Sequence, residues 1–436
     1  MLRLLLTSSL AMIVAGAGLP PSGRGGDWPQ WRYDAQRSAA SPDELPAQLR
    51  THWVRELPRL KPAWPDQAKM QFDAAYEPVA AGQRLFVGSS FDNTVTAYDT
   101  RSGRELWTFF ADGPVRFAPL VWEDKLYFAC DDGYLYCLKA ADGSLIWRFR
   151  GGPSDRKILG NERLISTWPA RGAPVVADGK VYFAAGIWPF MGIFLHALDA
   201  RTGEVIWTND GDGSTYMKQP HNADSFAGVA PQGPLAVVGE RLLVPGGRSV
   251  PACYDRATGK LIYYQLAENA KKGGGSAVAA TDQLLFNGRA VFDLATEKYL
   301  GSAGEFVAFA GGRLYDGDEG KLREIDLQAS GLSQEKSIDR TGKSATAAKW
   351  SIKQLGQAGT PKVTALIKAG SRLYVGSSGR VLAFALPLDT EGDAKPIWEA
   401  ELEGTPVSLV AADDRLFATT LEGRLYCFGV ADRAPS

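Results

Sequence analysis

The sequence predicts an all-β protein, a β-propeller of about eight four-stranded blades, and two observations support this fold class. An eleven-residue pattern recurs along the 436-residue chain. A short run of β-branched and aromatic residues precedes each copy, as expected of a strand. Each unit therefore holds three to four antiparallel strands and no helix. Because a lone sheet of this size cannot bury both of its faces, such units stack radially around an axis.

The recurring pattern begins with a small residue and an aromatic or aliphatic residue, often followed by Asp. A Gly stands six positions after the small residue, and an aromatic residue stands four positions after the Gly. Four copies keep this spacing without a gap, at 97–107, 137–147, 197–207 and 253–263. Four ungapped copies make chance a poor explanation, so the pattern indicates a structural repeat.

Strand-like runs such as 84–88 and 125–129 precede the copies, and Asp132-Gly133 is a strong two-residue hairpin signal. Together these features predict eight blades of about 48 residues, close to known propeller repeats. Seven blades remain an alternative if the weak unit at 276–301 merges with its neighbour. The blades are expected near 76–110, 118–150, 173–209, 234–266, 276–301, 306–352, 363–402 and 408–430.

The last expected blade, 408–430, ends without its aromatic strand. The segment 49–57 near the N-terminus has the same pattern of residues as the missing strand. We therefore expect 49–57 to complete the last blade and close the ring, which would remove both free sheet edges.

The first residues follow the pattern of an export signal. Arg3 precedes an apolar run, and Ala15 and Ala17 fit a signal-peptidase site. We therefore expect a periplasmic or secreted protein, cleaved near Ala17. No later stretch reaches the ~20 apolar residues of a membrane span. The expected domains are a signal peptide at 1–17, an N-terminal extension at 18–48, the propeller at 49–430 and a C-terminal tail at 431–436.

The repeat resembles the tryptophan-docking motif of the pyrroloquinoline quinone (PQQ) repeat propellers, over nearly the whole mature chain. In that family the Trp packs across the blade interface, onto the small residue and turn of an adjacent blade. The opening at 27–32 and the stretch 157–251 look like secreted planctomycete-type members. The docking position holds Trp107, Trp147, Trp207 and Trp398, with Tyr263 in the fourth blade, and the small position holds Ala97, Cys137, Ala197, Cys253, Ala383 and Cys427.

The resemblance implies two functional alternatives, since one fold hosts many functions. Quinoprotein alcohol dehydrogenases hold PQQ and calcium over the central channel. Non-catalytic relatives include the propeller lipoprotein of the outer-membrane barrel-assembly machinery. The dehydrogenases typically carry two adjacent cysteines near PQQ, and this chain has no Cys-Cys pair. We therefore expect a non-catalytic propeller without a cofactor, with PQQ and calcium as the alternative.

Cysteine and histidine usage argues further against a metal or redox centre. Three of the four cysteines stand where other blades place Ala, so we expect buried thiols. A bridge between Cys130 and Cys137 remains open. The three histidines form no tight cluster with cysteine, which makes a zinc site improbable. The oxygen-rich stretch 210–214 is more typical of a polar loop than of a calcium site.

Blades two to four carry inserts that a minimal propeller does not need. The stretch 148–171 holds six Arg or Lys against two acidic residues, and 186–194 and 209–228 add aromatic and polar residues. Long loops on a rigid scaffold suit ligand binding, although they could equally cap the ring. A further insert at 318–362 is expected to be a solvated surface loop. The candidate ligand-binding residues are Arg156, Arg163, Trp168, Arg171, Trp188 and His221.

These observations favour a periplasmic or secreted binding or scaffold propeller over the alternatives, a PQQ-type or other redox enzyme and a hydrolytic or sugar-processing role. A net charge of −1 gives no global attraction to nucleic acid. The expected partner is an envelope protein or a small anionic or sugar-like ligand, which cations and aromatic rings recognise. We expect a monomer, no catalytic residue and no metal.

Overall fold

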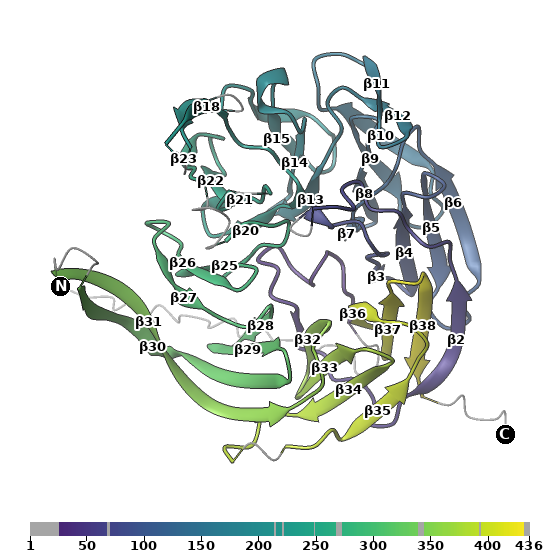
Figure 1. Ribbon diagram of the computed structural model, residues 1–436. Coiled ribbons are helices and arrows are strands. Elements are labelled where there is room, and N and C mark those ends of the chain that lie inside the picture. The colour runs from purple at the N-terminus through teal and green to yellow at the C-terminus, as the bar shows by residue number, and fades with distance from the viewer. Residues whose placement is uncertain are drawn as a thin grey trace, which may run out of the picture.

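A computed structural model shows a closed ring of eight blades around a central axis (Figure 1). The structure describes residues 26–430 apart from 68–69, 213–214, 220–221, 248, 267–272, 339–343 and 392–393. Each blade contains an antiparallel four-stranded sheet, so the predicted fold class is confirmed. The predicted signal peptide and C-terminal tail lie outside the described residues.

The first four blades follow one another along the chain, each running from its innermost to its outermost strand. Blade 1 contains β3 (Val79–Ala81), β4 (Arg84–Ser89), β5 (Thr94–Asp99) and β6 (Glu105–Phe110). Blade 2 contains β7 (Leu120–Trp122), β8 (Lys125–Ala129), β9 (Tyr134–Lys139) and β10 (Leu145–Arg150). Blade 3 contains β13 (Gly172–Ala177), β14 (Lys180–Ala185), β15 (Phe194–Asp199) and β16 (Val205–Asn209), and β19 (Gly233–Pro234) pairs with its inner edge. Blade 4 contains β20 (Ala236–Val238), β21 (Arg241–Val244), β22 (Ala252–Asp255) and β23 (Leu261–Tyr263).

The remaining blades complete the ring. Blade 5 contains β24 (Ala279–Ala280), β25 (Leu284–Asn287), β26 (Ala290–Asp293) and β27 (Tyr299–Ser302), so the weak unit at 276–301 is a blade of its own. Blade 6 contains β28 (Phe306–Ala310), β29 (Arg313–Asp318), β30 (Lys321–Ile338) and β31 (Ser344–Gly359). Blade 7 contains β32 (Ala365–Ala369), β33 (Arg372–Ser377), β34 (Arg380–Ala385) and β35 (Trp398–Glu401). Blade 8 contains β36 (Pro406–Ala412), β37 (Arg415–Thr420), β38 (Arg424–Gly429) and, from the N-terminal side, β2 (Arg50–Glu56).

The core lies between the blades rather than inside any one of them. The second strands β4, β8 and β14 are buried along nearly their whole length, because each of their faces packs on a neighbouring sheet. Outer strands such as β6 and β10 contain only exposed and half-buried positions. This gradient explains why the inner strands are continuous apolar runs in the sequence.

The ring closes through β2, as predicted. It pairs antiparallel with β38, with Trp53 opposite Cys427 and Glu56 opposite Arg424. The last blade is therefore built from both ends of the propeller, and β2 pairs with the edge that β38 would otherwise expose.

The repeat tryptophans link five of the blades, 1, 2, 3, 7 and 8, to the next blade in the ring. Trp107 Nε1 of blade 1 donates to the Ala140 carbonyl of blade 2 at 3.2 Å. Its ring covers Gly143, where a Cβ atom would come within 2.6 Å of the ring, so only glycine fits this turn. The small residue Ala97, however, faces Trp107 across the strands of its own blade. The same donation is made by Trp147 to Arg201 at 3.2 Å, by Trp207 to Arg256 at 3.0 Å, by Trp398 to Leu49 at 2.9 Å and by Trp53 to Thr100 at 3.1 Å.

The N-terminal extension forms a strap, residues 26–41, which crosses the centre of the ring in purple (Figure 1). It bonds to each blade near the turn that follows the innermost strand. Trp28 exchanges backbone hydrogen bonds with Ala80, and β1 (Ala40–Ser41) pairs with β32. Carbonyls of the strap accept from the other blades: Gly26 from Asp413, Pro29 from Val121, Ala35 from Val237, Gln36 from Ala280 and Ser38 from Phe309, while the Gln30 side chain bonds to Val176. The strap therefore covers one end of the channel.

The prediction of a surface loop at 318–362 is wrong. This stretch forms the long hairpin of β30 and β31, which projects beyond the ring (Figure 1). Its polar composition concealed the strands, because a two-stranded ribbon outside the core needs no apolar face.

Two further findings bear on the predictions. All four cysteines are free and buried, which excludes the bridge between Cys130 and Cys137 in this structure. Within the described part of the chain, no helix is long and apolar enough to cross a membrane.

Candidate functional site: the insert face and the channel

The inserts of blades 2 to 4 emerge on one face of the ring. In an antiparallel blade, the loop that enters the innermost strand and the turn between the second and third strands lie at the same end. The inserts at 150–171 and 209–234 are of the first kind, and the one at 186–193 is of the second. We call this end the insert face; the strap covers the opposite end.

A buried ion-pair network lies beneath the insert face. Arg171 donates to Asp131 through Nε at 3.0 Å and Nη2 at 2.9 Å. Arg116 donates to the same carboxylate at 2.6 Å and to Asp73 at 2.5 Å. Burial alone would raise the pKa of Asp131, but Arg171 and Arg116 hold it below its usual value. Because Asp73, Asp131 and Arg171 come from three segments of the chain, the network ties the loops together.

Arg171 and Trp188, both predicted ligand residues, meet through Trp64. The Arg171 guanidinium lies over the Trp64 ring at 5.8 Å, and the Trp188 ring contacts Trp64 edge-on at 6.0 Å. The Arg171 side chain is fully buried, and its Nη1 has no hydrogen-bond partner. Arg171 therefore supports the loops instead of presenting its charge at the surface. Trp64 was missed by sequence reasoning, because it lies outside the repeats and the inserts.

The other predicted ligand residues that the structure describes, Arg156, Arg163 and Trp168, lie on different parts of the insert face. Trp168 donates to the Met191 carbonyl at 2.7 Å and so anchors the short helix η2 (Pro189–Met191). Arg163 donates to Asn93 at 3.1 Å and to the Phe91 carbonyl at 2.6 Å, on the turn of blade 1. Arg156 is exposed, and His221 lies outside the described residues.

The insert face also exposes large apolar side chains. They lie on the turn of blade 1, on the hairpin of β11 (Lys157–Gly160) and β12 (Arg163–Ser166), around η2, and on the hairpin of β17 (Thr215–Lys218) and β18 (Asp224–Ala227). Contacts between β18 and η2 make the last two groups continuous. We call these seven side chains, 40–81% exposed, the insert-face patch: Phe91, Leu159, Leu164, Trp188, Phe190, Tyr216 and Phe226.

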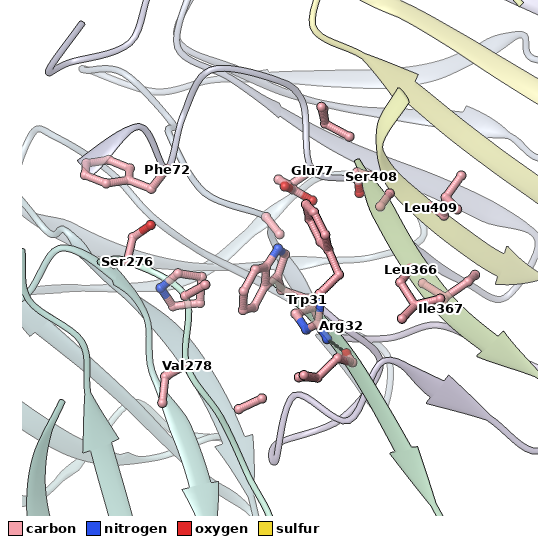
Figure 2. A pocket seen from close by; sticks show the side chains of 18 of the residues that line it. Trp31, Arg32, Phe72, Glu77, Ser276, Val278, Leu366, Ile367, Ser408 and Leu409 are labelled. Carbon is pink, nitrogen blue, oxygen red and sulfur yellow. Dashed lines mark hydrogen bonds between the residues drawn. The ribbon is translucent and has the colours of Figure 1, made fainter. Parts of the chain in front are cut away.

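The channel contains a cavity of about 290 Å³ (Figure 2). Residues at the start of the innermost strands line it, so it lies towards the insert face, and Trp31 and Arg32 of the strap form its floor. Phe72 and Phe117 stack on each other at 4.8 Å in its wall. Most of the remaining lining is aliphatic.

One carboxylate and one guanidinium stand out in this cavity. Burial raises the pKa of Glu77 to about 7, although hydrogen bonds from Ser408 and Trp31 and the charge of Arg32 oppose the shift. Burial likewise lowers the pKa of Arg32 to about 10. Both side chains keep part of their surface exposed, which places them deep in the protein but open to the cavity. The sequence analysis had noted 27–32 only for its resemblance; two Trp and an Arg in an otherwise polar extension were the available signal.

The cavity does not fit PQQ with calcium. PQQ carries three carboxylates, whereas the described lining offers Arg32 as its cation against Glu77 and Glu305. A calcium ion needs six to eight oxygen ligands, and no group of three or more His, Cys, Asp or Glu in the described residues could hold a metal. The four cysteines lie apart, so the adjacent pair typical of the dehydrogenases is missing.

Comparison with known proteins supports the fold and names a family. The family profile described as outer membrane protein assembly factor BamB matches residues 31–184 and 191–436. Solved structures that share the fold include two dehydrogenases. The quinohemoprotein alcohol dehydrogenase of Comamonas testosteroni has a TM-score of 0.57 and 16% identity, over 94% of this chain and 82% of that one. A europium-containing methanol dehydrogenase has a TM-score of 0.59 and 13% identity, over 93% and 98%.

Curated relatives match only in part. The dehydrogenase subunit of a quinone alcohol dehydrogenase from Gluconobacter oxydans (strain 621H) is 27% identical over 42% of this chain and 25% of its own length. The corresponding subunit from Gluconacetobacter polyoxogenes is 32% identical over 26% of this chain and 16% of its own length. The matches thus span a quarter or less of these relatives.

Proposed function

The chain belongs to the family described as outer membrane protein assembly factor BamB, and from this premise we propose a non-catalytic binding propeller of the cell envelope that holds an acidic, apolar segment of another protein. The observation that carries the proposal is the insert-face patch. Exposed apolar groups gathered on one face mark interaction sites in soluble proteins. The exposed apolar residues of the outer strands, such as Val205 and Ile262, lie instead on separate blades.

Charge indicates the nature of the partner segment. Of the two acidic residues on the 148–171 insert, Glu162 is already paired with Lys61 at 2.7 Å. The 148–171 insert therefore carries net positive charge, which complements acidic residues and speeds their approach. The 209–228 insert carries Asp210, Asp212 and Asp224 against Lys218, so the attraction for an acidic segment is confined to the 148–171 side of the patch. The exposed cations of the 148–171 insert are Arg148, Arg150, Arg156 and Lys157, of which Arg148 is paired with Asp112 at 3.9 Å.

The support of the loops suits recognition of an outside partner. The network of Asp73, Arg116, Asp131 and Arg171 holds the inserts from below, so the patch is presented on a firm base. A preformed surface loses less conformational entropy on binding than a flexible one. The family description supports an envelope location and a protein partner, and we propose both for this chain.

A fluorescent peptide alternating Glu with Phe and Leu tests the proposal by anisotropy. Binding is expected, and a peptide with Lys in place of Glu should bind at least tenfold more weakly. The double variant Leu159→Ser, Phe190→Ser should lose affinity by more than tenfold, since burial of each side chain contributes about 1.5–3 kcal/mol. The matched control Ile262→Ser, Ile397→Ser, also exposed apolar positions, should bind normally. Equal binding by both double variants, or no binding of the acidic peptide, would refute the patch as the site.

The dehydrogenase names of the curated relatives make PQQ the alternative to test. Protein incubated with PQQ and calcium and then desalted should show no PQQ absorption, because the lining offers too few cations. Stoichiometric PQQ retained with the protein would replace the non-catalytic proposal by a quinoprotein one.

A further inference from the structure

The channel cavity is separate from the insert-face patch and has its own chemistry. The strap covers the channel end opposite the inserts, and residues such as Pro78, Ala118 and Pro234 line the cavity at the end nearer the insert face. A volume of about 290 Å³ lies at the lower limit of small-molecule sites. The cavity therefore suits a small molecule that enters from the insert face.

Its walls suit an apolar body. Phe72 and Phe117 stack at 4.8 Å on one side, while Leu366, Ile367 and Leu409 lie on another (Figure 2). Rings and branched aliphatic side chains of this kind enclose an aromatic or aliphatic group by dispersion and exclusion of water.

The charged groups of the lining are not neutralised by each other. Glu77 and Arg32 affect each other's pKa through space, yet no ion pair within 4.0 Å joins them. Arg32 donates through Nη2 to the Val307 carbonyl and through Nε to the Arg37 carbonyl at 3.2 Å. Its Nη1 has no partner among the described residues. The remaining carboxylate, Glu305, is held by Arg289 at 3.1 Å.

From this arrangement we propose that the channel binds a small zwitterion with an apolar body, such as an α-amino acid. Its ammonium group would meet Glu77, and its carboxylate would meet Arg32. Both groups line the same cavity without an ion pair between them, so each can meet one of the two opposite charges of a dipolar molecule. Charge-assisted hydrogen bonds are roughly twice as strong as neutral ones, so a zwitterion would satisfy both groups where a singly charged ligand satisfies one. The proposal does not depend on the insert-face patch.

Calorimetric titration of the full chain with three probes tests this proposal: L-phenylalanine, phenethylamine and 3-phenylpropanoate. They share a phenyl body and differ in charge. L-Phenylalanine should bind at least tenfold more tightly than either of the others. If phenethylamine or 3-phenylpropanoate binds as tightly as L-phenylalanine, or none of the three binds, the proposal is wrong.

Two variants locate the site. Glu77→Gln should weaken L-phenylalanine at least tenfold and leave 3-phenylpropanoate no weaker, a split that misfolding would not produce. Glu305→Gln is the matched control, because this carboxylate lies on the same lining but is paired with Arg289, and it should bind normally. Unchanged L-phenylalanine affinity in Glu77→Gln would overturn the assignment. The patch variant Leu159→Ser, Phe190→Ser should leave this affinity intact, so the two proposals can fail separately.

The unmodified protein provides a second measurement. Arg32 is the charged group that acts on Glu77, and Ser408 and Trp31 are its hydrogen-bonding neighbours. Affinity for L-phenylalanine should fall as pH drops below about 7, where Glu77 becomes protonated. A flat profile between pH 6 and pH 8 would contradict the role of Glu77, with those two values chosen as about one unit either side of the pKa.

Discussion

Substitution of Arg37 by Met should cost this protein about 3–5 kcal/mol of unfolding free energy, because it leaves buried backbone carbonyls without a hydrogen-bond donor. Arg37 lies in the strap and is fully buried. Its guanidinium donates to Leu235 at 2.8 and 2.6 Å, to Pro174 at 3.2 Å, to Trp31 at 2.9 Å and to Asp34 at 3.3 Å, all backbone carbonyls.

The magnitude follows from two opposing effects. Burial lowers the pKa of Arg37 to about 9, so burying the cation itself opposes folding. Met relieves that cost but takes the donor away from the buried Leu235 and Pro174 carbonyls and from the half-buried Trp31 carbonyl. The Asp34 carbonyl still accepts from the Arg37 backbone N–H at 3.1 Å. Each buried unsatisfied group costs about 1–3 kcal/mol, and the side chains are similar in length, so the loss of donors prevails.

Urea unfolding followed by tryptophan fluorescence measures the change. The control is Arg104→Met, an exposed residue of the repeat, which should stay within about 0.5 kcal/mol of the unmodified protein. If Arg37→Met unfolds within about 1 kcal/mol of the unmodified protein, the strap does not depend on this arginine and the hydrogen-bond reasoning fails.

Three further outcomes are expected. Deletion of 50–56 removes β2 from blade 8 and the Trp53 link to blade 1; the protein should aggregate or melt far lower, and an unchanged melting temperature would contradict closure by this strand. Glu77→Gln should stabilise the protein by up to about 3 kcal/mol at pH 8. The folded pKa of Glu77 is about 7, above the ordinary 4.5, so the ionised carboxyl destabilises the fold increasingly as pH rises from 4.5 to 7. Denaturation at pH 5 and pH 8 should show that the difference in unfolding free energy between variant and unmodified protein is smaller at pH 5. An equal difference at both pH values would rule out a titrating Glu77. Burial lowers the pKa of His196 to about 4, so His196 affects stability in the opposite sense, but equally in both proteins. Thiol titration in denaturant without reductant should find all four cysteines, and two would indicate a disulfide.

The blade repeat could be predicted because the same contact, a tryptophan packed on a glycine turn, recurs between blades. Gly103, Gly143 and Gly203 adopt positive φ values of 67°, 75° and 77° beneath a tryptophan from the preceding blade. The turn admits only glycine and the tryptophan ring packs flat on it, so Gly and Trp recur in the sequence at a fixed spacing. Closure by β2 was predictable for the same reason, since Trp53 follows the pattern.

The sequence predicted which face of the ring carries the candidate site, but not which of its residues contact a ligand. The inserts and their aromatic residues were evident, but burial of Arg171 depends on Asp131, 40 positions away in the chain. Exposure decides whether a cation meets a ligand or supports a loop, and exposure is not encoded by residue type.

The amino-acid sequence by itself therefore determined the fold of each blade and the closure of the ring, because the same few residues recur in each copy. The fully folded chain alone decided the strap, the cavity and the pairing of charges. Arg37 bonds to Leu235 across 198 positions, and Glu77 meets Ser408 only once eight blades surround the axis. Such contacts have no period and no local signature, since they arise from distant segments that ring closure brings together.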